Sequence, residues 1–175
     1  MNAIVIYESI YGNTRAIAEA VAEGLGDGAR TMTPAELSAE ATHTDLLVVG
    51  GPTHIHGMAT DRSRRVALET AGAQAPAGPA LRDWLGELAG APGAQAAAFD
   101  TRLNKPEWLT GAASLRIARR LRRHGYTVLD TASFLVAESE GPLVDGELER
   151  ARDWGADLAA MLPGVGVGVG TETEA

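Results

Sequence analysis

The chain has 175 residues, 45% of them apolar and 22% charged, which is the composition of a globular domain and not of a disordered chain. Its formal net charge of −8 argues against nucleic acid as the main partner, because phosphate backbones bind positive surfaces. The chain contains no cysteine, which excludes disulfides, thiolate catalysis and Cys-ligated metal sites, and no apolar run approaches the roughly eighteen residues that cross a bilayer.

The first half of the chain alternates between strand-like and helix-like segments. Taken in order, these are a strand over 3–7, a helix over 14–25, and strands over 30–33 and 45–50. The first strand is a continuous β-branched apolar run, typical of a strand buried on both faces of a parallel sheet. Ile17, Val21 and Leu25 recur at i, i+4 and i+8 and predict the helix. No basic segment precedes the first strand, so we expect no signal peptide and a cytoplasmic protein.

The second half of the chain continues this alternation. It is predicted to contain helices over 60–71, 80–88, 114–123 and 143–162, and strands over 95–99 and 126–136. We expect an interruption of the last strand around Asp130, and an N-cap of the last helix at Asp145. Leu115 and Leu121 are predicted to face the core from the helix that contains them.

Strand and helix alternate about five times along the chain, which predicts βαβ units with helices on both faces of one sheet. We therefore predict an α/β fold: a three-layer, doubly wound, five-stranded parallel sheet in the order 2-1-3-4-5. One domain is expected over 1–162, followed by a disordered low-complexity tail over 163–175. Ligands of such sheets bind beyond the carboxyl ends of the strands.

The loop after the first strand carries groups that suit a phosphate, and we call it the phosphate loop. Its residues are Ser9, Ile10, Tyr11, Gly12, Asn13 and Thr14. Two hydroxyls, a glycine that allows close approach, and the N–H groups that open a helix supply donors without a lysine. The loop fits neither a Walker A loop nor a dinucleotide fingerprint. Because Ser and Thr also commonly begin helices, the alternative interpretation is an ordinary helix cap.

The run from Ile4 to Thr14 resembles the phosphate loop of flavodoxins, whose pattern is Thr/Ser-x-Thr-Gly-x-Thr. It matches this pattern at Ser9, Gly12 and Thr14 and departs from it at Tyr11. The order of elements extends the resemblance to about residue 162. The resemblance implies a flavodoxin-like fold with one flavin mononucleotide (FMN) as cofactor.

Two further loops resemble the segments that hold the flavin ring in this family. The first follows the strand over 45–50, and its expected contacts are Pro52, Thr53, His54, Ile55, His56 and Gly57. The second follows the strand over 95–99, and its expected contacts are Asp100, Thr101, Arg102 and Trp108. Trp108 is predicted either to stack on the ring or to pack as a core aromatic. The His54–His56 pair lacks a third ligand at metal-site spacing, so we expect no metal.

No group of residues fits acid–base or nucleophilic catalysis, and the flavin would carry the electrons. The preferred function is therefore an FMN-binding electron carrier. The alternative is an FMN-dependent NAD(P)H:quinone-type oxidoreductase, which the Gly51-Pro52-Thr53 run also resembles. A third interpretation, a flavin-free receiver-like module, lacks the acidic residues that it would need. We expect an acidic redox partner protein to dock near Arg62, Arg64 and Arg65; the sequence leaves the oligomeric state undetermined.

Overall fold

The computed structural model describes residues 1–36, 44–54, 57–70 and 79–162. The predicted tail over 163–175 lies outside these residues, as do Ile55 and His56. The strands are β1 (Ala3–Tyr7), β2 (Ala29–Met32), β3 (Leu46–His54), β4 (Gly57–Met58), β5 (Gln95–Leu103) and β6 (Thr127–Val136). The helices are α1 (Asn13–Leu25), α2 (Asp61–Thr70), α3 (Leu81–Glu87), α4 (Glu107–Thr110), α5 (Ala113–Arg123) and α6 (Glu147–Met161). Among the described residues, we find no helix with the length and apolarity that a membrane span requires.

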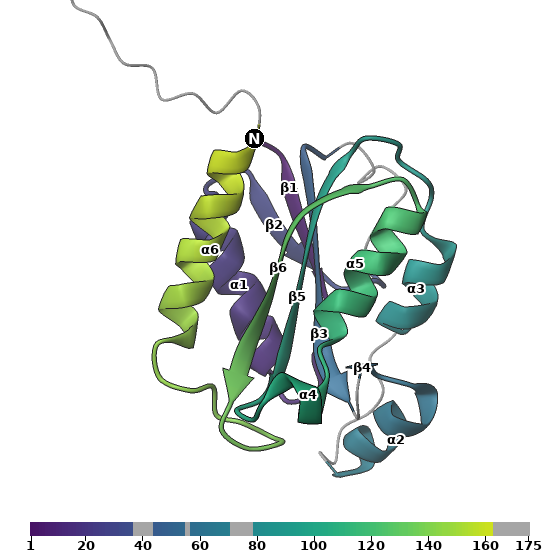
Figure 1. Ribbon diagram of the computed structural model, residues 1–175, viewed down its shortest axis with the longest axis vertical. Helices are drawn as coiled ribbons and strands as arrows, with labels where there is room; N and C mark the ends of the chain where they lie inside the picture. Colours follow the sequence, from purple (N-terminus) through teal and green to yellow (C-terminus); the bar gives the residue numbers. More distant parts are fainter. Residues whose placement is uncertain (37–43, 55–56, 71–78, 163–175) are drawn as a thin grey trace, which may run out of the picture.

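A parallel sheet in the order β2-β1-β3-β5-β6 forms the middle layer, and β4 pairs antiparallel with the end of β3. Helices α1 and α6 cover one face, and α3 and α5 cover the other (Figure 1). This is the doubly wound sheet that the alternation of segments predicts, so the predicted fold class is confirmed.

The core consists of two apolar clusters, one on each face of the sheet. Successive side chains of β1 point to opposite faces, so Val5 joins one cluster and Ile4 and Ile6 join the other. On the α1/α6 side, Phe99, Phe134 and Trp154 pack edge-to-face with ring centroids 6.0–6.3 Å apart. The sheet is thus buried on both faces, which explains its continuous apolar strands.

Two strands are longer than the sequence predicts, and both extensions run toward the carboxyl edge of the sheet. The strand predicted over 45–50 continues to His54, and the strand predicted over 95–99 continues to Leu103. Gly51 and Pro52 pair with Asp100 and Thr101 of the neighbouring strand. Pairing of the two strands imposes strand geometry on residues that, taken singly, have low strand propensity.

Smaller predictions divide into confirmed and wrong ones. The interruption expected near Asp130 is a shift of register between β5 and β6 at that point. Leu115 was predicted to face the core, but its side chain is 50% exposed and Ile117 is buried in its place. Asp145 does not cap α6: the N-cap is Gly146, at φ 85°, without a capping side-chain hydrogen bond.

Candidate functional site

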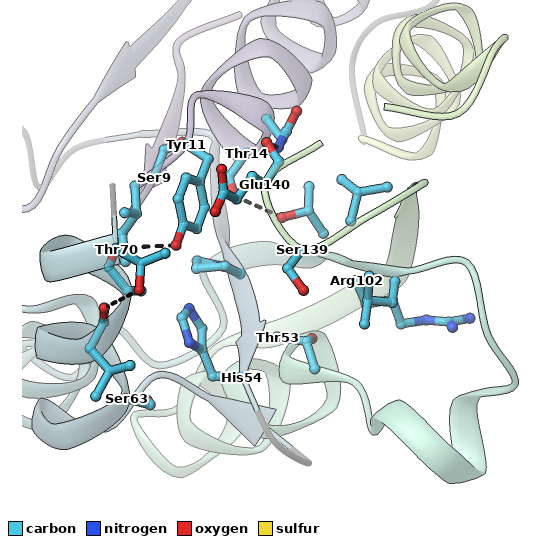
Figure 2. Close-up of a pocket in the computed structure, with 18 of the residues that line it drawn as sticks. Ser9, Tyr11, Thr14, Thr53, His54, Ser63, Thr70, Arg102, Ser139 and Glu140 are labelled. Atoms are coloured by element: carbon cyan, nitrogen blue, oxygen red, sulfur yellow. Dashed lines mark hydrogen bonds between the residues drawn. The ribbon is translucent and has the colours of Figure 1, made fainter. Parts of the chain in front are cut away.

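A cavity of about 720 Å³ lies at the carboxyl edge of the sheet, where the loops after β1, β3, β5 and β6 meet α2. Figure 2 shows its walls, with side chains from these five segments turned toward a common space. Ten of the predicted site residues line it: Ser9, Ile10, Tyr11, Asn13, Thr14, Pro52, Thr53, His54, Thr101 and Arg102. The tertiary structure therefore brings together the three loops that were identified separately in the sequence.

The phosphate loop leads into α1 with an open N-terminus. Gly12 is the N-cap of α1 at φ 89°, and no side chain forms a capping hydrogen bond there. A Cβ at Gly12 would meet no atom within 4 Å, so its left-handed φ, and not crowding, accounts for the glycine. The N–H groups that open a helix have no partner within the helix and carry partial positive charge. Such a terminus suits an anion.

The hydroxyls of the phosphate loop lie close to these N–H groups. Ser9 Oγ accepts a hydrogen bond of 3.1 Å from the Gly12 N–H. Thr14 is almost fully buried, and its Oγ1 lies 2.8 Å from Thr101 Oγ1. This contact joins the phosphate loop to the end of β5, so one predicted binding loop sets the position of the other.

Asn13 joins the phosphate loop to the loop before α6. Its Nδ2 donates a hydrogen bond of 3.0 Å to the carbonyl oxygen of Glu140. Next to Glu140, Gly141 has φ 110°, and a Cβ there would lie 2.7 Å from Asn13 Oδ1. The loop that carries Ser139 and Glu140 is thereby held against the cavity.

Tyr11 and His54 point into the cavity from opposite walls (Figure 2). The Tyr11 hydroxyl donates a hydrogen bond of 3.1 Å to the carbonyl oxygen of Ala67 in α2. Burial raises the pKa of Tyr11 and lowers the pKa of His54. At neutral pH both side chains are therefore uncharged, and His54 contributes no positive charge to the site.

Thr53 and Asp100 have structural tasks at the start of α5. Thr53 Oγ1 accepts a hydrogen bond of 2.9 Å from the Ala113 N–H, and Asp100 Oδ2 accepts one of 2.8 Å from the Ser114 N–H. The two side chains thus cap a helix that has no capping side chain of its own. Asp100 is fully buried below the cavity and does not line it, and burial raises its pKa.

Arg102 and Trp108 lie toward the outer side of the site. Arg102 lines the cavity, but its guanidinium points away from the centre and donates a hydrogen bond of 2.7 Å to the Lys105 carbonyl oxygen (Figure 2). Trp108 is 81% exposed, which rules out the core-aromatic alternative, and it does not line the cavity. Gly57 is buried, and a Cβ there would overlap the Arg116 side chain.

Sequence reasoning missed one wall of the cavity, the inner face of α2. Its lining residues are Arg62, Ser63, Val66, Ala67 and Thr70, preceded by Thr60. The helix itself was predicted. The face that it turns toward the cavity is mostly polar, so the spacing of apolar residues did not indicate which side of the helix faces the site. Ser139 and Glu140 were also missed, although their place after the last strand at the carboxyl edge was a usable indication.

The comparisons with known proteins agree with this architecture. The flavodoxin family model matches residues 5–83, whereas no curated protein matches the chain. A mutant of the flavodoxin from Pseudomonas aeruginosa is 19% identical, with a TM-score of 0.65 over 94% of this chain and 100% of that one. Flavodoxin 1 from Bacillus cereus is 18% identical, with a TM-score of 0.65 over 93% of this chain and 99% of that one. The fold of this chain is flavodoxin-like.

A flavodoxin, WrbA-like protein from Agrobacterium tumefaciens is also similar, at 21% identity, with a TM-score of 0.54 over 91% of this chain and 95% of that one. Members of the flavodoxin family bind FMN. FMN consists of a flat ring, a ribityl chain and a phosphate monoester. The open N-terminus of α1 suits the phosphate, and the largely apolar cavity beside it suits a ring. The residues present in this flavodoxin-like chain therefore fit the cofactor.

Behind the phosphate loop, a buried ion pair joins α2 to Glu8, the residue that directly follows β1. Arg64 Nε lies 2.6 Å from Glu8 Oε1, and the two side chains are 16% and 8% exposed. Neither atom has a well-aligned hydrogen bond, so the contact is mainly Coulombic. Glu8 Oε2 accepts a hydrogen bond of 3.3 Å from the Leu81 N–H at the start of α3. Burial raises the pKa of Glu8 despite the opposing effect of Arg64.

Proposed function

We propose that this protein binds one FMN in the 720 Å³ cavity and carries electrons between partner proteins. The observation that supports this proposal best is the uncapped N-terminus of α1 at Gly12, with the Ser9 and Thr14 hydroxyls beside it and the cavity in front. Neutral donors of this kind bind a phosphate without adding a lysine or arginine charge. When bound, FMN supplies the chemistry by taking up and releasing electrons at its ring.

In this proposal each wall of the cavity has a task. The phosphate loop holds the phosphate, while Pro52, Thr53 and His54 border the ring on one side and Thr101 and Arg102 border it on another. Thr53 is fixed by its hydrogen bond to α5, and Thr101 by its contact with Thr14. The cavity walls are thus positioned by the fold, which limits the rearrangement that binding requires.

A reductase of the NAD(P)H:quinone type is the competing function. The connection between β5 and β6 supports the electron-carrier function. It contains the short helix α4, of four residues, and the helix α5, and it adds no further element to the site. The two functions differ in one assay. The carrier, loaded with FMN, exchanges electrons with redox proteins but does not catalyse sustained oxidation of NAD(P)H by a quinone.

For the redox partner, the structure changes the set of candidate docking residues. Arg64 was expected to contact the partner, but it is mostly buried and paired with Glu8. Arg62 and Arg65 remain exposed on α2, and Arg62 also lines the cavity. We propose these two arginines as docking residues at the edge of the site. Charge reversal at both is expected to slow electron transfer to an acidic partner at low salt.

The test of the cofactor site uses two glycines in the same conformation. Gly12 and Gly146 are the N-caps of α1 and α6, both are left-handed (φ 89° and 85°), and both face open space. Alanine at either position carries a similar backbone strain, of about 1–2 kcal/mol. Only Gly12→Ala is expected to weaken FMN binding, by about tenfold or more, in a titration followed by quenching of flavin fluorescence.

Riboflavin, which lacks the phosphate, serves as the second probe in this titration. Wild-type protein is expected to bind FMN much more tightly than riboflavin. Gly12→Ala is expected to reduce the ratio of the two affinities, whereas Gly146→Ala is expected to leave this ratio unchanged. Failure of the wild-type protein to bind FMN would contradict the proposal. Equal affinity for the two flavins would contradict the role of the phosphate loop.

A further inference from the structure

The outer face of α5 carries a row of arginines. Arg116, Arg119, Arg120 and Arg123 stand at i, i+3, i+4 and i+7, which places them along one side of the helix. We call these four residues the arginine row. At 1.5 Å of rise per residue the row is about 10 Å long. Helix α5 lies on the outside of the molecule next to α3 (Figure 1). Arg116, Arg119 and Arg123 are exposed, and Arg120 is half-buried.

Within the described parts of the chain, no carboxylate lies within ion-pair distance of the arginine row. Elsewhere Arg15, Arg64, Arg150 and Arg152 each pair with a glutamate at 2.5–2.8 Å. Arg120 donates a hydrogen bond to the Arg82 carbonyl oxygen, which brings a further arginine close. The row is therefore a concentrated positive surface on a chain whose net charge is −8.

The stability of the helix does not account for the whole row. Arg120 and Arg123 lie in the last turn of α5, where positive charge interacts favourably with the helix dipole. Arg116 and Arg119 lie earlier and gain nothing from it, while like charges spaced by three and four residues repel each other. Burial lowers the pKa of Arg120, and the neighbouring Arg82 and Arg123 lower it further, against a smaller opposing effect of Asp83.

The row begins next to the candidate site. Arg116 packs against Gly57 of β4, and β4 pairs with Thr53 and His54, both of which line the cavity. The start of α5 is held to the same wall by the hydrogen bond from the Ala113 N–H to Thr53. A protein bound over Arg116 and Arg119 would thus lie beside the edge of the cavity.

We propose that the arginine row is a docking surface for the acidic surface of a partner protein. Charge complementarity points to this partner, because the row is positive and has no carboxylate partner among the described residues, while the rest of the chain carries the net negative charge. A row of one helix, about 10 Å long, covers only about three base pairs of duplex, and the remaining negative surface repels nucleic acid. The proposal supplies a partner for the electron transfer proposed above, but its binding step does not depend on FMN.

The test measures binding of the full chain to poly-L-glutamate, a protein-like polyanion, by fluorescence anisotropy at low salt. The test variant replaces Arg116, Arg119 and Arg123 with glutamine. The matched control makes the same change at Arg15, Arg30 and Arg152, which are exposed on other elements. The test variant is expected to bind at least about tenfold more weakly than wild type, because three exposed ion pairs each change affinity a few-fold. The control is expected to change affinity by less than about threefold.

Four measurements decide the outcome. Equal losses in the two variants would show a nonspecific effect of net charge and overturn the proposal. Tighter binding of duplex DNA or of phosphatidylserine vesicles than of poly-L-glutamate at matched charge and salt would overturn it in favour of those partners. Self-association that the test variant abolishes would identify a second copy of the chain as the occupant instead. Each binding measurement is made with and without added FMN. Because docking to the arginine row does not require FMN, a failure of FMN binding and a failure of docking are distinguished.

Discussion

Removal of Arg64 tests the buried ion pair behind the phosphate loop. In Arg64→Ala, Glu8 keeps its hydrogen bond from the Leu81 N–H but loses the guanidinium 2.6 Å from Oε1. Removing one partner of a buried pair costs about 3–5 kcal/mol. Because Arg64 remains 16% exposed and Glu8 can take up a proton, we expect the lower end, about 3 kcal/mol at neutral pH. With an m-value of about 2 kcal/mol/M, the urea midpoint falls by about 1.5 M.

The pH dependence separates charge from packing. Burial already raises the pKa of Glu8 above its ordinary 4.5, so the folded state holds its proton to higher pH than the unfolded chain does. Stability from this group is therefore lost as pH rises above about 4.5. Without Arg64 the pKa of Glu8 rises further, and the loss at neutral pH becomes larger. Below about pH 4.5, where the carboxyl is protonated in both states, the difference between variant and wild type is expected to shrink.

Urea titrations at neutral pH and near pH 4 measure both effects. Arg15→Ala is the matched control, since Arg15 pairs with Glu19 at the surface with 64% and 47% exposure, and little change is expected at either pH. The double variant Glu8→Gln, Arg64→Met removes both charges and is expected to recover much of the loss. A destabilisation of Arg64→Ala that is the same at both pH values would refute the electrostatic reasoning and assign the effect to packing of the arginine side chain.

Three further predictions follow from single residues. Gly50→Ala places a Cβ 2.0 Å from the Phe99 ring and is expected to lower the free energy of unfolding by about 3 kcal/mol. In the control, Gly86→Ala, the new Cβ on α3 meets no atom within 4 Å, and the free energy of unfolding is expected to rise by about 0.5–1 kcal/mol. Because the pKa of His54 is lowered, the unfolded chain binds its proton first as pH falls below about 6.5, so wild type loses stability there and His54→Gln flattens that loss in thermal unfolding. If Trp108 stacks on the flavin, Trp108→Phe weakens FMN binding several-fold in calorimetry; unchanged affinity would contradict stacking.

The extensions of β3 and β5 show where local sequence ceases to be informative. Gly51, Pro52 and Asp100 individually favour loops, and their strand geometry comes from pairing between two chain segments about fifty residues apart. Gly50 and Gly51 lie in this paired segment of β3. In the structure, a Cβ at Gly50 would overlap Phe99 and one at Gly51 would approach Leu81 to 2.8 Å. Close packing accounts for both, against the Phe99 ring of the neighbouring strand β5 at Gly50 and against Leu81 of α3 at Gly51.

The sequence by itself determined the alternation of strands and helices, the doubly wound sheet and the place of the phosphate loop, because these depend on periodicity and on residues adjacent in the chain. Tertiary structure alone decided which distant side chains meet. It paired Arg64 with Glu8, set Thr14 against Thr101, used Thr53 to cap α5 and made α2 a wall of the cavity. Such contacts depend on the positions of several elements at once, and no local pattern in the chain encodes them.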